Sequence, residues 1–381
     1  MRSLDQWLLA TMCCGVFALA GCASNGEHAS GTPTGPITPP PLVPTLKAKF
    51  AYTGNQGGSL SGYSVDTSTG ALTALNGFPL IVGANPTVVA VDPQNRFLFV
   101  GDIAASELHV FAINGSTGAL SEISASPYAT VKEPVSIAVD PSGTHVYVAS
   151  QGSNSVGGFS LSATGPLAPI AGSPFATSGT QDFGDDLVIN TGGTFVYVQD
   201  LGNIYAYSVS ASSGALMLAQ TVAGPSMGGG IALDPHGTYL YAVGSGTNSI
   251  LAYSVNASTG QLTPARSSPM VEQSGAYIIS VSPTGQFAYT IENNNDLVSY
   301  SLSNGAFTSV GSVYPLVYGQ RIGVDPSGSF VYVPQGCSNC PGAAYNVVNE
   351  FSIGGTGALT KISGSPVAAG TTPWGIAFTT Q

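Results

Sequence analysis

From residue 48 to the end of the chain, short apolar segments alternate with polar, turn-forming segments in a repeating order. In each repeat an apolar run such as Ile137–Asp140 ends in a tight turn of the type Asp-Pro-x-Gly. A second run follows with aromatic residues two positions apart, which places both rings on one face of a strand. A third run leads to the phrase Thr-Gly-Ala-Leu or a close variant, and a fourth run follows it. Each repeat therefore predicts four β-strands and no helix.

The aromatic pairs of the second strands predict how neighbouring repeats contact one another. Both rings of a pair face the same side, so we expect them to wedge against the next repeat. The pairs are Phe50/Tyr52, Phe97/Phe99, Phe195/Tyr197, Tyr239/Tyr241, Phe287/Tyr289 and Phe330/Tyr332, and His145 replaces the first aromatic in the remaining repeat.

The Thr-Gly-Ala-Leu phrase sets the period of the repeat. Its glycines are Gly70, Gly118, Gly165, Gly214, Gly260, Gly305 and Gly357. They recur every 45 to 52 residues, and such a period built from strands alone is typical of a β-propeller with one repeat per blade. We therefore predict an all-β, seven-bladed β-propeller with four-stranded antiparallel blades. A six-bladed ring with stray ends is the alternative.

The two ends of the repeat region predict how the ring closes. The first repeat starts at its second strand, Phe50–Thr53, and the chain ends with a lone first strand, Trp374–Phe378. We expect these segments to pair in one blade, which would leave no free sheet edge at the closure.

The first 46 residues lack the repeat. Arg2 precedes an apolar stretch that ends in Leu19-Ala20-Gly21-Cys22, and this ending resembles the bacterial lipobox. The resemblance implies cleavage before Cys22, acylation of that cysteine, and a lipid anchor in the cell envelope, at the outer membrane if there is one. An ordinary secretory signal is the alternative. We predict a signal peptide at 1–21, a linker rich in Pro, Gly, Ser and Thr at 22–46, and the propeller at 47–381.

Composition narrows the range of partners. Charged residues make up 7% of the chain, against about 25% in an average protein, and the net charge is −11. Because no basic stripe occurs, nucleic acid is excluded as a partner. We expect a monomer whose partner is a small molecule or a protein, attached to a membrane only through its lipid.

Two of the five cysteines, Cys337 and Cys340, fall in an enlarged loop of the last repeat, Pro334–Asn346. They could form a redox dithiol, half of a zinc site or a disulfide. Zinc needs about four ligands, and a thioredoxin-like site needs a helix N-terminus. An oxidising compartment favours the disulfide.

Charged residues gather where the first strands enter the ring. Four positions before the Asp-Pro place, the seven repeats carry Val88, Ser136, Asp186, Gly230, Ile278, Arg321 and Gly375. Asp186 and Arg321 are three repeats apart, so we expect them to face each other across the mouth of the central channel. An unpaired guanidinium is costly in a water-restricted funnel, so Arg321 should pair with an acid or wait for a ligand oxygen.

Other candidate site residues lie in the same segments, and we expect a ligand to contact them there. They are Glu133, Asp182, Asp185, Tyr277, Gln320 and Trp374. The acids could also face bulk water, or bind calcium through Asp182, Asp185 and Asp186. We predict no other metal and no cofactor. The histidines His109, His145 and His236 fall outside the mouth, which argues against a histidine base there.

The Asp-Pro-x-Gly turn, the Tyr-Val strand and the Thr-Gly-Ala-Leu turn together resemble the seven-bladed propeller lactonases over residues 48–381. That family includes bacterial 6-phosphogluconolactonase and fungal carboxy-muconate cyclase, and it is similar to the Tyr-Val-Thr-Asn surface repeats. Its site pattern is Pro-Arg-His at a first strand and a Glu beyond the next Tyr. Here Gln320 and Arg321 hold the Arg-His places and Gly336 holds the Glu place. Glu292 comes nearest to the acid, without an Arg-His in its own repeat.

Two hypotheses follow from this comparison. In the first, the propeller binds a neutral or sugar-like ligand, or a protein, at its mouth. In the second, which the resemblance implies, it hydrolyses a lactone, with Arg321 stabilising the oxyanion and Asp186 or Glu133 orienting a water. The departures from the family pattern favour the first hypothesis.

Overall fold

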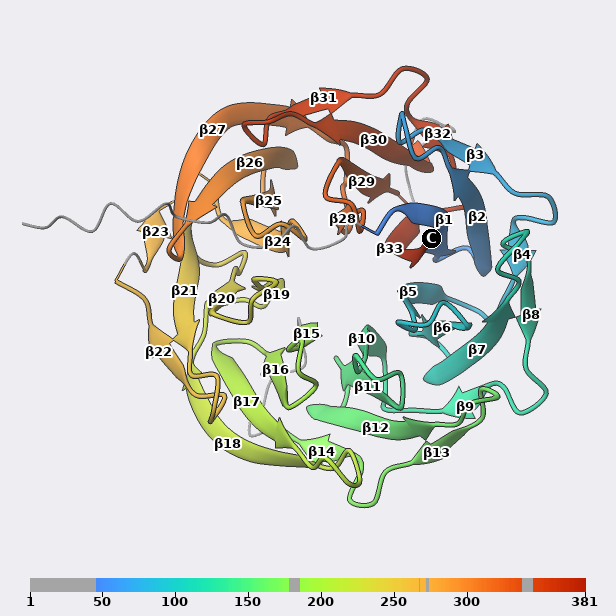
Figure 1. Cartoon of the computed structure of the whole chain (residues 1–381), viewed down its shortest axis with the longest axis horizontal. Helices are drawn as coiled ribbons and strands as arrows, with labels where there is room; N and C mark the ends of the chain where they lie inside the picture. The colour runs from blue at the N-terminus through green and yellow to red at the C-terminus, as the bar shows by residue number, and fades with distance from the viewer. Residues whose placement is uncertain (1–45, 178–185, 267, 272–273, 338–344) are drawn as a thin grey trace, which may run out of the picture. The chain divides into compact units, whose positions relative to one another are not determined.

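The chain forms a ring of seven antiparallel sheets (Figure 1). The computed structural model describes residues 46–177, 186–266, 268–271, 274–337 and 345–381. The described residues all belong to one compact unit, Pro44–Gln381. They contain no α-helix. The predicted seven-bladed propeller is confirmed.

Blades are numbered here in chain order, and each sheet is given from its innermost strand outward. Blade 1 contains β33 (Pro373–Thr380), β1 (Ala48–Asn55), β2 (Ser59–Val65), β3 (Leu72–Ala74) and β4 (Leu80–Ile81). Blade 2 contains β5 (Pro86–Val91), β6 (Phe97–Asp102), β7 (Glu107–Ile113), β8 (Leu120–Glu122) and β9 (Tyr128–Ala129). Blade 3 contains β10 (Pro134–Val139), β11 (His145–Ser150), β12 (Ser155–Leu161), β13 (Leu167–Pro169) and β14 (Phe175–Ala176). Blade 4 contains β15 (Asp186–Ile189), β16 (Phe195–Gln199), β17 (Asn203–Val209) and β18 (Leu216–Ala223).

The remaining three blades continue the same order. Blade 5 contains β19 (Ile231–Leu233), β20 (Tyr239–Ala242), β21 (Ser249–Val255), β22 (Leu262–Pro264) and β23 (Met270–Val271). Blade 6 contains β24 (Ala276–Val281), β25 (Phe287–Glu292), β26 (Asp296–Ser303) and β27 (Ala306–Pro315). Blade 7 contains β28 (Gly323–Val324), β29 (Phe330–Gln335), β30 (Val347–Ile353), β31 (Leu359–Lys361) and β32 (Val367–Ala368). The first strand of every blade lies nearest the central axis (Figure 1).

Blade 1 is built from both ends of the propeller, as the sequence predicts. β1 pairs antiparallel with β33, with Ala51 opposite Phe378 and Thr53 opposite Ile376. The backbone N–H of Phe50 also donates to Thr379 Oγ1 at 3.0 Å. The last strand of the chain thus completes the first blade and closes the ring.

The glycine of each Thr-Gly-Ala-Leu-type turn packs against the first aromatic, or histidine, of the preceding blade. All seven glycines have positive φ, and a Cβ built on any of them would lie 2.3–2.8 Å from that ring. The partners are Phe330–Gly70, Phe50–Gly118, Phe97–Gly165, His145–Gly214, Phe195–Gly260, Tyr239–Gly305 and Phe287–Gly357. The rings therefore wedge against the next blade as predicted, and glycine is required there for both its conformation and its size.

The second aromatic of the pair adds a hydrogen bond to the same turn. In four blades a buried tyrosine hydroxyl donates to the carbonyl of that glycine, at 2.7–2.9 Å. These bonds are Tyr52–Gly118, Tyr147–Gly214, Tyr197–Gly260 and Tyr332–Gly70. Burial raises the pKa of the Tyr197 hydroxyl to about 12, so it remains a donor at neutral pH.

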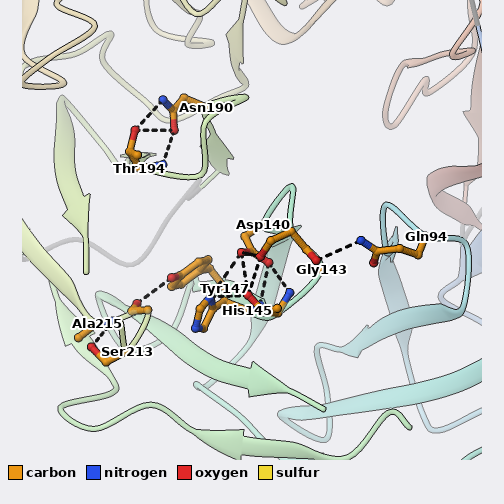
Figure 2. A network of polar contacts seen from close by, with 12 residues as sticks. Gln94, Asp140, Gly143, His145, Tyr147, Asn190, Thr194, Ser213 and Ala215 are labelled. Carbon is orange, nitrogen blue, oxygen red and sulfur yellow. Dashed lines mark hydrogen bonds and ion pairs between the residues drawn. The ribbon is translucent and has the colours of Figure 1, made fainter. Parts of the chain in front are cut away.

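The turn between first and second strands is held by its own acidic residue. Asp140 Oδ1 accepts the backbone N–H groups of Thr144 and His145, and Asp92, Asp234 and Asp325 do the same in their blades. Figure 2 shows the blade 3 copy, in which Tyr147 also points toward the turn that carries Ser213 and Ala215. The Asp-Pro-x-Gly segment therefore forms a turn that its own aspartate stabilises, and this turn lies at the end of the channel opposite the mouth.

The outer strand differs from the simple prediction. We expect one fourth strand per blade, ending near a proline, but in five blades it is divided into two short strands that both pair with the third strand. A Ser-Pro or Phe-Pro step stands at the break, because proline has no N–H to continue the ladder. Blades 4 and 6 lack this step and keep one long outer strand, β18 or β27.

Candidate functional site

A cavity of about 290 Å³ opens at the end of the channel where the first strands begin. Its lining comes from six blades: Gln56, Trp374, Thr87, Val88, Ile103, Val135, Gln151, Gly228, Gly229, Tyr277, Ile278, Gln320 and Arg321. The walls are largely aliphatic and aromatic, and the polar groups are few and separated. Such a lining is typical of a small-molecule site.

Arg321 and Asp186 meet across the channel. Arg321 Nη1 lies 3.0 Å from Asp186 Oδ2, and Arg321 Nη2 donates to the carbonyl of Val135 at 3.2 Å. The predicted facing of these two residues is thus found, and their distance allows a direct ion pair. Arg321 is therefore paired with an acid, and the alternative in which it waits unpaired for a ligand oxygen does not apply.

A third blade supports this pair. The hydroxyl of Ser136 donates to Asp186 Oδ1 at 2.7 Å, and the backbone N–H of Leu187 lies 3.0 Å from the same oxygen. Both oxygens of the carboxylate are therefore engaged. The network joins blades 3, 4 and 7 across the axis.

The ion pair lies between two cavities. A second cavity of about 150 Å³ is lined by residues one step further along the first strands, such as Val89, Ile137 and Ile376. Arg321 lines both cavities, whereas Asp186 lines the second alone. The guanidinium therefore forms part of the floor of the mouth cavity.

The other polar groups of the mouth cavity are neutral. The Tyr277 hydroxyl donates to the carbonyl of Gly319 at 2.7 Å, and burial raises its pKa to about 12. Gln320 Nε2 donates to the carbonyls of Tyr318 and Gly336, which fixes its carboxamide at the rim. Thr87 is 3% exposed, and its Oγ1 has no hydrogen-bond partner among the described residues.

The structure brings together only part of the predicted site. Gln320, Tyr277, Trp374 and Arg321 line the mouth cavity, and Asp186 lies beneath it. Glu133 pairs instead with Lys132 Nζ at 3.2 Å and is not among the lining residues.

Four predicted residues lie outside the described part of the chain. These are Cys22, the predicted lipidation site, Asp182 and Asp185, which we placed at the mouth, and Cys340. Cys337 is disulfide-bonded. No cluster of three or more His, Cys, Asp or Glu side chains suited to a metal ion occurs among the described residues. Calcium binding and the Cys337–Cys340 pair stay predictions.

Sequence reasoning missed Gln56, Gln151 and Thr87. The glutamines follow second strands, in loops that differ from blade to blade, so alignment of the repeats does not single them out. Searching those loops for residues with carboxamide side chains would have found both.

Comparison with known proteins assigns the family. The sequence profile of the family "Lactonase, 7-bladed beta-propeller" matches residues 32–131 and 230–381, well over half of the chain. The chain belongs to this family. A search of curated proteins finds no significant match.

Solved structures share the fold of this lactonase-family propeller at low identity. A candidate 6-phosphogluconolactonase from Bacteroides uniformis superposes with a TM-score of 0.73 at 17% identity, over 88% of this chain and 100% of that one. A second candidate, from Bacteroides fragilis, gives 0.72 and 17%, over 90% and 100%. The periplasmic gluconolactonase of Pseudomonas aeruginosa gives 0.70 and 17%, over 87% and 99%.

The segments of this lactonase-family propeller that match the family profile include one residue of the ion pair but not the other. Arg321 lies in a matched segment, whereas Ser136 and Asp186 lie in the unmatched residues 132–229. Glu292, the nearest counterpart of the family acid, is 6% exposed and does not line the mouth cavity. Burial raises its pKa, and Tyr300 donates to it at 3.4 Å. Glu292 is thus buried within blade 6 and does not face the mouth cavity.

The arrangement can hold a neutral ring by stacking and hydrogen bonding. Trp374 and Tyr277 supply aromatic surface, and Gln56 and Gln151 can both donate and accept. Gln320 can only accept, because both of its N–H groups donate to backbone carbonyls. Arg321 has five N–H groups and makes two hydrogen bonds to the protein. Its remaining N–H groups can donate to a ligand oxygen.

Proposed function

We propose that this lactonase-family propeller binds a small, neutral, sugar-like molecule, such as a sugar lactone, in the mouth cavity. One observation carries the proposal: the only charge on the described lining belongs to Arg321, and Asp186 already neutralises it. A ligand that matches this lining is uncharged and carries several hydroxyl or carbonyl groups.

The size and chemistry of the cavity support a ligand of one sugar ring. Its volume of about 290 Å³ is near the lower limit of small-molecule sites, about 300 Å³. Carboxamides from blades 1, 3 and 7 approach from different directions, which suits a ring with hydroxyls on several sides.

Lactone hydrolysis is the second candidate, and family membership favours it. In that reaction water attacks the carbonyl carbon, the ring C–O bond breaks, and the ring oxygen leaves as an alcohol after taking a proton. Arg321 would donate to the carbonyl oxygen as negative charge develops on it. Neither carboxylate of our sequence hypothesis, Asp186 or Glu133, lines the mouth cavity, and no carboxylate or histidine does so among the described residues. For this reason we place binding before hydrolysis.

We further propose that the protein is exported and anchored in the cell envelope by a lipid on Cys22, acting as a monomer. The lipobox-like sequence supports this, and a structural neighbour is named as periplasmic. Among the described residues there is no helix of the length and apolarity needed to cross a bilayer. Mass spectrometry of the mature N-terminus tests the anchor, and an unmodified start at another residue would contradict it.

Calorimetry with D-glucono-δ-lactam, a neutral ring that does not hydrolyse, tests binding by the full chain. We expect saturable binding that weakens at least roughly fivefold, about 1 kcal/mol, in Gln151→Ala. Gln94→Ala is the matched control, because Gln94 lies in a turn at the opposite end of the channel and donates to the carbonyl of Ser142 (Figure 2). No saturable heat, or equal weakening in both variants, would refute the proposal.

A pH-stat assay with D-glucono-δ-lactone decides between the two candidates. Binding alone predicts acid release at the uncatalysed rate. Release above that rate, lost in Arg321→Gln, would establish hydrolysis instead.

A further inference from the structure

The floor of the mouth cavity carries a cation whose charge is cancelled from the far side of the channel. Arg321 comes from the segment before β28 in blade 7, and Asp186 begins β15 in blade 4. At the equivalent places in the other five blades stand Val88, Ser136, Gly230, Ile278 and Gly375, none of them charged. The opposite charges thus occupy two of seven otherwise neutral positions.

We propose that Asp186 determines the charge selectivity of the mouth. By neutralising Arg321 it excludes anions such as hydroxy acids and phosphorylated sugars, and it leaves the cavity to neutral ligands. The identity of the neutral ligand rests on the proposed function, whereas the exclusion of anions does not.

The geometry of the pair supports this role. The carboxylate and guanidinium are in direct contact at 3.0 Å, and their side chains are 14% and 24% exposed. An anion that approached the guanidinium would also approach the carboxylate, and the repulsion would offset most of the attraction. At this level of burial solvent screens such charges only in part, so both interactions remain substantial. Discrimination by a repulsive group built into a site is a general means of specificity.

Asp186 is also held where an anion cannot easily displace it. The Ser136 hydroxyl, the Leu187 N–H and Arg321 together occupy its two oxygens. Arg321 has a second anchor in the Val135 carbonyl, so its position does not depend on Asp186 alone. Removing the negative charge should therefore leave the guanidinium near its place with its positive charge uncovered.

A neutral ligand meets no such obstacle. The N–H groups of Arg321 that bond neither Asp186 nor Val135 can donate to a carbonyl or hydroxyl oxygen while the ion pair stays intact. The same site thus accepts a lactone and rejects the hydroxy acid that forms when the lactone opens. For a lactone hydrolase this selectivity would also promote product release.

The test compares wild type with Asp186→Asn, which keeps the shape of the side chain and removes its charge. The probes are D-gluconate, inorganic phosphate and the neutral D-glucono-δ-lactam, each titrated into the full chain by calorimetry. In Asp186→Asn we expect gluconate and phosphate to bind at least roughly tenfold tighter than in wild type, about 1.4 kcal/mol. That gain should shrink as salt is raised. Unchanged anion affinity in a folded variant would overturn the proposal.

Two further variants keep the result decisive. Asp186→Asn/Arg321→Gln should lose the gained anion binding, because the uncovered cation is gone; if the gain persists, the inference is wrong. Arg321→Gln alone uncovers the carboxylate, so the cation D-glucosamine should bind more tightly than in wild type. This reciprocal arm also decides the matter if Asp186→Asn fails to fold. If wild type binds no lactam yet Asp186→Asn gains phosphate binding, the proposed function fails and the selectivity role stands.

Discussion

The contacts between neighbouring blades are the same around the ring, whereas the residues at the mouth of the channel differ from blade to blade. Every blade boundary repeats one device, a glycine turn under a ring of the neighbouring blade, even where His145 replaces the aromatic. At the mouth no two blades present the same set of residues, and the ion pair of Arg321 with Asp186 occurs once. Repetition therefore marks what holds the ring together, and departure from repetition marks the cavity where we propose that a ligand binds.

Removal of the closing strand should have the largest effect on stability. Deleting residues 371–381 exposes the edge of β1 and removes the contact of Phe378 with Tyr332, whose ring centroids lie 5.2 Å apart. We expect the melting temperature to fall by more than about 10 °C, with loss of a single cooperative transition. Deletion of residues 24–44, which contain no repeat, is the control. Equal melting temperatures for the two deletions would contradict closure by β33.

A single methyl group at a blade boundary should have the next largest effect. Gly260→Ala places a Cβ 2.3 Å from the ring of Phe195, at a φ of +70°. We expect a loss of roughly 2–4 kcal/mol in the free energy of unfolding, measured with denaturant. Gly77→Ala is the matched control, because its φ is +86° and its Cβ would meet no atom within 4 Å. The control should lose only about 1 kcal/mol. Similar losses would show that backbone conformation alone explains these glycines.

Substitutions at the mouth should have the smallest effect on stability. The carboxamides of Gln56 and Gln151 line the cavity and make no side-chain hydrogen bond within the described part of the chain. Gln56→Ala and Gln151→Ala should each change the free energy of unfolding by less than about 0.5 kcal/mol. A loss as large as that of Gly260→Ala would show that the mouth also stabilises the ring, which would weaken the contrast drawn above.

The same contrast explains what could be predicted from the sequence. Seven copies of a glycine turn and of an aromatic pair reveal their common role by recurrence, so the fold, the ring closure and the blade contacts follow from alignment of the repeats. The divided outer strand was missed because a proline near a strand end is compatible with either a stop or a break. In blades 4 and 6 the absence of the Ser-Pro or Phe-Pro step, as in β18, accompanies the continuous strand.

The candidate site was predicted only in part, for a related reason. Asp186 and Arg321 are visible because charge is rare in this chain and both break the pattern at an aligned position. Gln56 and Gln151 lie in loops of unlike sequence, where no alignment defines an exception. Glu133 was placed at the mouth from its position alone, whereas its contact with Lys132 depends on side-chain directions that spacing does not determine.

The pairing of β1 with β33 sets the order in which the molecule can be completed during synthesis. The backbone N–H of Phe50 donates a hydrogen bond to Thr379 Oγ1, although 329 positions separate the two residues in sequence. On a growing chain the strand made first must wait for the strand made last, and until then the exposed edge of β1 can pair with other strands. Pairing with β33 is therefore the final step in assembly of the propeller, and any protein quality control that acts before this step would meet an open ring.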